Sequence, residues 1–270
     1  MSTCTYCDQD GRLTREHILP SFIYKYQYNI GNGKTVGWRE KPQRIIEGEA
    51  VIKDVCENCN NVVLGEMDAY AKNMLERSGV FTKCFIKKDM IIDYNYGLLS
   101  RWLLKLAFNS SRASGKQLGV FDEFKNIILG RDSDFSGFVI TAGLFKPLKL
   151  TSEQQSKFGE HLGADYAGYV NPFLPRISFP QDDLPGIFIK QIVIGALIFH
   201  IVVFKNELSR EQRKDLMKEY LNMCKGMTLI RKNKSKITII QTPLTFIDSM
   251  QSHMLRPEVE PHLEKLLKSL

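Results

Sequence analysis

The sequence predicts an α+β protein in two parts, residues 1–80 and residues 81–270. Two CxxC pairs in the first part indicate a small module of two strands and a helix around a metal site. In the second part, helical and strand patterns follow one another without an internal repeat, which is typical of a mixed α+β domain. A chain of 270 residues with 43% hydrophobic content can bury a large core, which indicates an ordinary globular protein.

The first part reads as strand, strand, helix. A strand is expected around residues 14–19, and the alternating, β-branched segment "AVIKDVC" at 50–56 can pair with it. The segment "NNVVLGEMDAYAKNMLERSG" begins at Asn60, a good helix cap, and continues with apolar residues at helical spacing. Asn60 is therefore expected at the helix N-terminus, close to the strand pair.

The second part is expected to begin after a break near residues 76–83. Its strongest element is an amphipathic helix at 96–115, which ends in glycine and polar residues. Its other expected elements are a short helix at 120–130, strand pairs at 135–150, two strands at 186–204, a charged helix at 209–225, a strand at 236–243 and a last helix at 257–269. A domain of this kind can bind DNA, dimerise or dock an activating partner.

Two segments bear on the cellular location. The start of the chain has neither the basic n-region nor the apolar h-region of a signal peptide, which predicts a cytoplasmic protein. The apolar run at 186–204 reaches the length of a membrane helix, but it contains Lys190, Gln191 and His200 and many β-branched residues. Two buried strands turning near Gly195 fit this run better than a membrane span, so no membrane contact is expected.

Four of the six cysteines form two pairs with identical CxxC spacing. In a chain that reads as cytoplasmic, such pairs predict a tetrahedral thiolate zinc site rather than disulfides. The alternative is four unrelated cysteines. The expected structural zinc ligands are Cys4, Cys7, Cys56 and Cys59.

The positive charge lies away from these cysteines. Residues 1–76 carry 9 Lys or Arg against 11 Asp or Glu, so the formal net charge of +7 arises from the rest of the chain. The densest basic run is "RKNKSK", which contributes Arg231, Lys232, Lys234 and Lys236. This run is either a solvated loop or a patch that contacts nucleic-acid phosphates.

Between the two CxxC pairs lies "LTREHILP", residues 13–20. Glu16 and His17 are adjacent in a segment that begins like a strand, and adjacent strand residues point to opposite sides. The two side chains can therefore take different roles at one metal. The alternative is an ordinary surface glutamate beside a histidine that is satisfied within the fold.

The motifs "CTYC", "LTREHILP" and "CENCNN" followed by "LGEMD" resemble the zinc-knuckle branch of the HNH endonucleases. These are ββα-metal nucleases whose pattern runs CxxC, (D/E)H(I/V)xP, CxxCN. The resemblance covers the N-terminal module of residues 1–80, and the rest of the chain has no motif that can be assigned. The resemblance implies an HNH module with a four-cysteine zinc site.

The resemblance also implies a role for three residues. His17 would be the general base that takes a proton from the attacking water, a task suited to a neutral imidazole. Glu16 and Asn60 would be ligands of a catalytic divalent ion, and such oxygen ligands suit Mg²⁺ or Mn²⁺ better than zinc. The expected reaction is hydrolysis of a phosphodiester bond in DNA, with the ion at a phosphate oxygen.

Further residues of the module are secondary candidates. Asn61 and Asp68 are possible extra ligands or braces, although Asp68 also reads as an ordinary acid on a helix surface. Arg15 and Lys53 are candidate phosphate contacts, and the alternative is that each is simply solvated. Many HNH endonucleases carry an asparagine before the second CxxC pair. This chain offers only Asp54 there, which leaves the loop geometry open.

Two functions of different class follow. The first is a metal-dependent HNH endonuclease whose partner is DNA, working in a restriction or phage-defence system as a homodimer or with an ATPase or sensor subunit. The second is a zinc-stabilised nucleic-acid-binding or scaffold protein that has lost catalysis. The presence of Glu16, His17 and Asn60 favours the endonuclease, because a scaffold has no need of all three.

Overall fold

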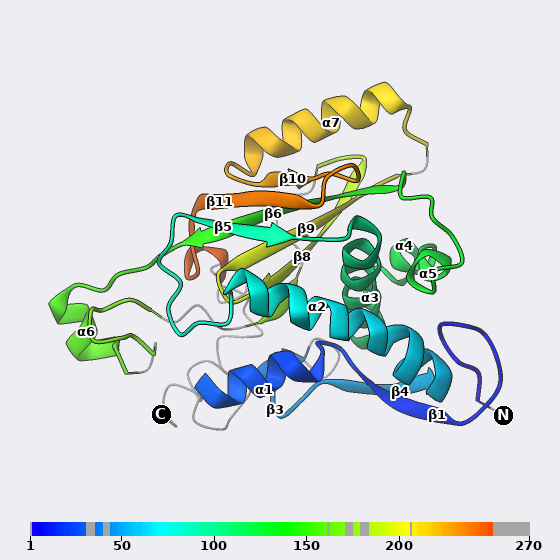
Figure 1. Cartoon of the computed structure of the whole chain (residues 1–270), viewed down its shortest axis with the longest axis horizontal. Coiled ribbons are helices and arrows are strands. Elements are labelled where there is room, and N and C mark those ends of the chain that lie inside the picture. Colours follow the sequence, from blue (N-terminus) through cyan, green and yellow to red (C-terminus); the bar gives the residue numbers. More distant parts are fainter. Residues whose placement is uncertain are drawn as a thin grey trace.

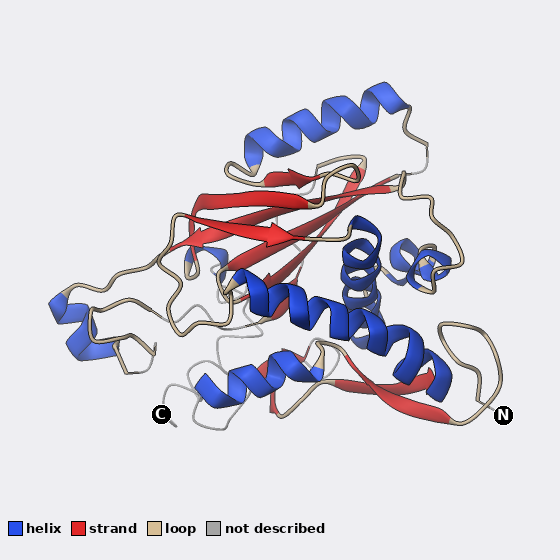
Figure 2. Ribbon diagram, in the orientation of Figure 1, coloured by secondary structure: helices blue, strands red, loops and turns tan. Residues whose placement is uncertain are grey.

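The structure is a computed structural model with mixed α and β content, as the sequence predicts (Figure 1, Figure 2). A large sheet carries helices on both faces, and a separate pair of strands lies near the N-terminus (Figure 2). The structure describes residues 2–30, 36–39, 44–160, 163–170, 175–178, 184–205 and 207–250.

The two strands expected in the first part form an antiparallel pair. Strand β1 (Leu13–His17) pairs with β4 (Val51–Cys56), which confirms that expectation. The connection between them holds helix α1 (Ser21–Ile30) and the antiparallel strands β2 (Val36–Arg39) and β3 (Arg44–Glu47). These three elements are absent from the expected strand, strand, helix order.

The helix that follows β4 begins earlier than expected and is irregular. A π-helical segment, η1 (Asn58–Leu64), leads directly into α2 (Gly65–Ser78), which ends at a left-handed Gly79. Asn60 therefore lies inside the helix and makes no cap, which corrects the expected helix start. Wide π turns occur often at functional sites, because they redirect side chains.

The second part is built on a seven-stranded sheet. Its order is β5, β11, β6, β9, β8, β7, with β10 also paired to β6. The strands are β5 (Asp89–Asp93), β6 (Phe138–Lys146), β7 (Arg176–Ser178), β8 (Ile187–Ile194), β9 (Leu197–Phe204), β10 (Thr228–Ile230) and β11 (Lys236–Thr245). Strands β8 and β9 confirm the two strands expected from the long apolar run.

The strand pairs expected at 135–150 are wrong, because β6 is one continuous strand. Gly143 lies inside it, and a Cβ atom at this glycine would meet Met227 Sδ and Thr242 Cγ2, each at 2.6 Å. Glycine is therefore needed at this position because neighbouring segments approach closely, and it does not mark a turn.

Helices cover both faces of this sheet (Figure 1). Helix α3 (Tyr96–Ser114) and α2 lie on one face, and α7 (Arg210–Met223) lies on the other. The helices expected at 96–115 and 209–225 are thus confirmed. The short helix expected at 120–130 is two, α4 (Leu118–Asp122) and α5 (Lys125–Ile128). In the described part of the chain, the remaining helices are α6 (Ser152–Phe158) and the 3₁₀ turn η2 (Asp248–Met250). The helix expected at 257–269 lies outside the described residues.

One buried cluster joins the two parts of the chain. It contains Val55 and Leu75 from the first part together with Leu103, Ile140 and Phe199 from the second. Helix α2 contacts both α3 and β5, so the core continues across the break expected near residues 76–83. The N-terminal module therefore rests on α3 and the sheet.

Among the described residues, no helix has the length and apolar character needed to cross a membrane.

Candidate functional site

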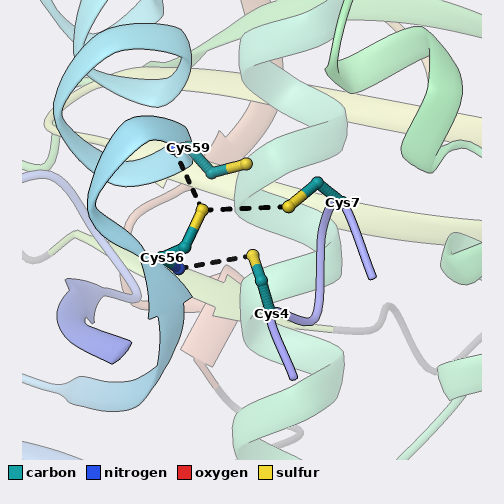
Figure 3. Close-up of side chains that lie close together, drawn as sticks. All are labelled: Cys4, Cys7, Cys56 and Cys59. Atoms are coloured by element: carbon teal, nitrogen blue, oxygen red, sulfur yellow. Dashed lines mark hydrogen bonds between the residues drawn. The ribbon is translucent and has the colours of Figure 1, made fainter. Parts of the chain in front are cut away.

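The four cysteines of the CxxC pairs come together at one end of the β1/β4 pair (Figure 3). Cys4 and Cys7 lie in the loop before β1, Cys56 ends β4, and Cys59 lies in η1. All four Sγ atoms lie within 4.8 Å of one another, and the Cys7 and Cys56 sulfurs are 3.8 Å apart. Four sulfurs around a tetrahedral ion, each about 2.3 Å from it, fit this spacing. The cluster could hold a metal such as zinc.

Backbone amides also point at these sulfurs. The Cys56 amide donates to Cys4 Sγ at 3.3 Å, and the Cys59 amide donates to Cys56 Sγ at 3.5 Å (Figure 3). Burial by itself would raise the pKa of the Cys4 thiol, but backbone N–H donors outweigh it and lower this pKa to about 7. Burial raises the pKa of Cys7 and Cys59, and a bound divalent cation favours the thiolate form of every ligand.

The β1/β4 pair has an outer and an inner face. We call the side of Arg15, His17, Val51 and Lys53 the outer face. Arg15 lies directly across from the exposed Lys53, and His17 lies across from Val51. Glu16 points the opposite way and is only 4% exposed. The expectation that Glu16 and His17 point to opposite sides is therefore confirmed.

On the outer face, His17 has an acidic partner, Glu49, that was not predicted from the sequence. His17 Nε2 lies 2.6 Å from Glu49 Oε2, and the two side chains are 32% and 29% exposed. Glu49 is near because the antiparallel register continues past His17 to a bond from the Ile18 amide to the Ala50 carbonyl. In the sequence, the signal that could have identified this partner is the position of Glu49, an acid just before the second strand. A carboxylate at one imidazole nitrogen orients the ring and supports proton transfer at the other.

On the inner face, Glu16 is paired with a lysine of the second part. The Lys105 ammonium on α3 lies 2.8 Å from Glu16 Oε1 and 2.7 Å from Asp68 Oδ2. We call these three residues the Lys105 cluster. Asp68 also accepts from Trp102 Nε1 at 3.1 Å, so it is more than an acid on a helix surface. Burial raises the pKa of Asp68, and the Lys105 ammonium opposes that shift.

The two expected ligands of a catalytic ion have other partners. Asn60 Nδ2 donates to Thr14 Oγ1 at 2.8 Å and to the Arg15 carbonyl at 2.9 Å, so it braces β1 against η1. Asn61 is exposed. Because the buried Glu16 carboxylate is already neutralised by Lys105, this side-chain arrangement does not fit a divalent ion held by Glu16 and Asn60.

Helix α3 forms the floor of the site through one stripe of donors. Trp102, Lys105, Asn109 and Arg112 follow one another at spacings of three or four residues, so they share a helix face. Asn109 Nδ2 donates to Glu16 Oε1 at 3.1 Å and to the His17 carbonyl at 3.0 Å. From the sequence, α3 was expected in a separate domain, and this stripe was not predicted. The signal was the presence of strong hydrogen-bond donors within the otherwise apolar side of an amphipathic helix.

The same stripe reaches the loop that carries the first two cysteines. Tyr6, between Cys4 and Cys7, donates from its hydroxyl to Asn109 Oδ1 at 2.6 Å. Arg112 bonds Asp54, which lies at the bulge in β4 and accepts from the Thr5 amide at 3.0 Å. Asp54 therefore ties β4 to the cysteine loop, in the region where the sequence left the loop geometry open.

The basic run lies elsewhere. Arg231, Lys232 and Lys234 are exposed in the turn between β10 and β11, and Lys236 begins β11 at 3.8 Å from Asp93. In Figure 1 these strands lie near the top of the molecule, and the β1/β4 pair lies at the bottom beyond α2. The run is therefore separate from the His17 site.

Comparison of the chain with protein-family models, with curated proteins and with solved structures found no match.

Proposed function

We propose that the protein is an endonuclease of the HNH type, which hydrolyses phosphodiester bonds in DNA at the outer face of the β1/β4 pair. One observation carries this proposal. A partly exposed histidine, His17, is paired with Glu49 and lies on the same face as two cationic side chains, Arg15 and Lys53. A general base activates the attacking water, and cations beside it can bind and position the phosphate, so this face offers two of the groups used in phosphodiester hydrolysis.

His17 takes a proton from a water molecule as the water oxygen attacks phosphorus. The P–O3′ bond breaks, and the 3′ oxygen leaves with the bonding electron pair and takes up a proton from solvent. Glu49 holds the imidazole ring and stabilises the imidazolium that forms. Arg15 and Lys53 bind the non-bridging phosphate oxygens and so position the phosphate in front of His17.

A structural zinc ion is proposed for the four cysteines. It would hold the loop of Cys4 and Cys7 against the end of β4 and the start of η1. The resemblance also implies Mg²⁺ or Mn²⁺, which would polarise the phosphate in a nuclease of this type. Since Glu16 and Asn60 do not fit such an ion as they lie, no step is assigned to it.

The wider setting is also a proposal. The exposed basic turn at Arg231, Lys232, Lys234 and Lys236 would contact phosphates further along the DNA. Membership of a restriction or phage-defence system, as a homodimer or with an ATPase or sensor subunit, rests on the resemblance alone.

The test is cleavage by wild-type protein and the His17→Ala variant. Plasmid, linear and single-stranded DNA are incubated with Mg²⁺ or Mn²⁺, with the protein alone and with the products of neighbouring genes. We expect wild-type protein to cut at least one substrate and His17→Ala to lose nearly all cleavage with its thermal unfolding unchanged. Wild-type protein that cuts none of them, or a His17→Ala variant that cuts as well as wild type, contradicts the proposal.

A second candidate is a zinc-stabilised protein that binds nucleic acid without cutting it. The ion pair between Glu16 and Lys105 favours this candidate, because Glu16, the expected ligand of a catalytic ion, is buried and already paired. Such a protein keeps its DNA affinity in the His17→Ala variant and loses affinity when Arg15 and Lys53 are both replaced by glutamine. DNA binding with no cleavage in any condition selects this second candidate.

A further inference from the structure

We propose that the Lys105 ammonium is the resident cation between β1, α2 and α3. In this view Glu16 and Asp68 are its structural counter-ions rather than ligands of a divalent ion. These contacts stabilise the N-terminal module, so their structural role does not depend on whether the protein cleaves DNA. It replaces the ligand role that the resemblance implies for Glu16.

The geometry of the Lys105 cluster supports this assignment. The Lys105 side chain is 0% exposed, and the side chains alone of Glu16 and Asp68 are 5% and 26% exposed. A buried ammonium needs counter-charges and hydrogen-bond acceptors, and here one nitrogen lies within 2.8 Å of two carboxylate oxygens. The three groups come from β1, α3 and α2, so the cluster joins three elements that are distant in sequence.

Neighbouring donors hold both carboxylates in place. Asn109 Nδ2 donates to Glu16 at 3.1 Å, and Trp102 Nε1 donates to Asp68 at 3.1 Å. Both donors belong to α3, like Lys105 itself, so one rigid helix supplies the cation and its supporting hydrogen bonds. The carboxylates are therefore arranged around a group that the chain carries with it.

A divalent ion would have to displace this ammonium. An ion bound between the same two oxygens would lie against a fixed positive charge, and like charges at contact distance in a buried site repel strongly. Because Lys105 belongs to the chain, its ammonium competes with a divalent ion for the two carboxylates at every concentration of free metal. Glu16 is thus expected to hold no divalent ion in the native protein.

Removal of the ammonium alone should change this preference. The N···O distances of 2.7 and 2.8 Å are a little longer than the ≈2.3–2.6 Å of Ca²⁺ ligands, so a small inward movement would let Ca²⁺ or Mn²⁺ bridge the two carboxylates. In Lys105→Met the two carboxylates share a largely buried site without a cation. This variant is therefore expected to depend on divalent ions for stability.

Thermal unfolding in metal-stripped buffer, with and without millimolar Ca²⁺ or Mn²⁺, tests the proposal. Wild-type protein and Lys72→Met, which removes an exposed lysine of α2, should not respond to the ions. We expect Lys105→Met to unfold about 10 °C lower and to regain more than half of that loss with the ions. The double variant Lys105→Met/Glu16→Gln should regain little, and zinc content is measured on the same samples.

Mn²⁺ binding to wild-type protein, followed by electron paramagnetic resonance, is the second arm and does not require Lys105→Met to fold. Equal binding to wild type and to Glu16→Gln supports the proposal. One Mn²⁺ bound per wild-type chain and lost in Glu16→Gln overturns it. A folded Lys105→Met protein that is indifferent to both ions overturns it as well.

Discussion

The two faces of the β1/β4 pair differ in what their acidic and basic groups can do. On the outer face, the side chains of His17 and Glu49 are each about one-third exposed to solvent. On the inner face, Glu16 is held by Lys105 and Asn109 beneath the strand. Adjacent residues of one motif thus lie in different environments, because strand geometry sends one side chain to solvent and the next into the core.

The largest expected effect distinguishes the two faces by stability. Glu16→Ala should lower the free energy of unfolding by about 3–5 kcal/mol, because it leaves the buried Lys105 ammonium with one counter-ion instead of two. His17→Ala should change it by less than about 1 kcal/mol, since its ion pair is partly exposed. Equilibrium unfolding in urea measures the free energy of unfolding of both variants. Equal losses in the two variants would show that the two faces do not differ in their contribution to stability.

Asn109 tests whether α3 supports both faces at once. Asn109→Ala removes the bonds to Glu16, the His17 carbonyl and the Tyr6 hydroxyl, so it should cost about 2–3 kcal/mol of unfolding free energy. It should also reduce cleavage, because the backbone of His17 loses its anchor. Lys72→Ala on the exposed side of α2 is the control, and a loss no greater than in this control contradicts the account.

Glu49 tests whether the carboxylate beside His17 contributes to cleavage. Glu49→Gln keeps the size of the side chain but removes the charge that stabilises imidazolium, so cleavage should fall about 10-fold or more. Its free energy of unfolding should change by less than about 1 kcal/mol. Initial rates at saturating DNA measure the effect, with Glu57→Gln, an exposed acid beyond β4, as the matched control. Cleavage unchanged from wild type would leave Glu49 without a role at His17.

The smallest expected effect concerns DNA affinity. Replacing Arg15 and Lys53 by glutamine should reduce the slope of log K against log salt concentration by about 2, because two phosphate contacts are lost. Replacing Lys232 and Lys234 tests the separate basic turn in the same way. Fluorescence anisotropy over a salt series measures both slopes. An unchanged slope for Arg15 and Lys53 would place the DNA elsewhere.

Local sequence patterns predicted much of the fold. Alternation of apolar residues predicted β4, the strand-like start of the Glu16 and His17 segment predicted β1, and helical periodicity predicted α3. Gly195 marked the turn between β8 and β9. The paired CxxC spacing predicted the cysteine cluster. Each of these signals acts over a short segment or repeats a spacing that only one arrangement satisfies.

The inner face could not be predicted from such patterns. The bond from Asn109 to Glu16 joins residues 93 positions apart, and nothing local to either residue marks the other. The continuous strand β6 was misread because Gly143 has a packing role that depends on Met227 and Thr242. Glu49 required the strand register to be extended past His17. In each case the missing information was a tertiary contact.

The roles of the two faces are separated by comparing cleavage by His17→Ala and Glu16→Gln, measured side by side on folded protein. In Glu16→Gln the amide oxygen can still accept from Lys105, so the fold should persist. We expect His17→Ala to lose nearly all cleavage and Glu16→Gln to stay within about 10-fold of wild type. Equal loss of cleavage in both variants, with both folded, would contradict this expectation and return Glu16 to the reacting centre.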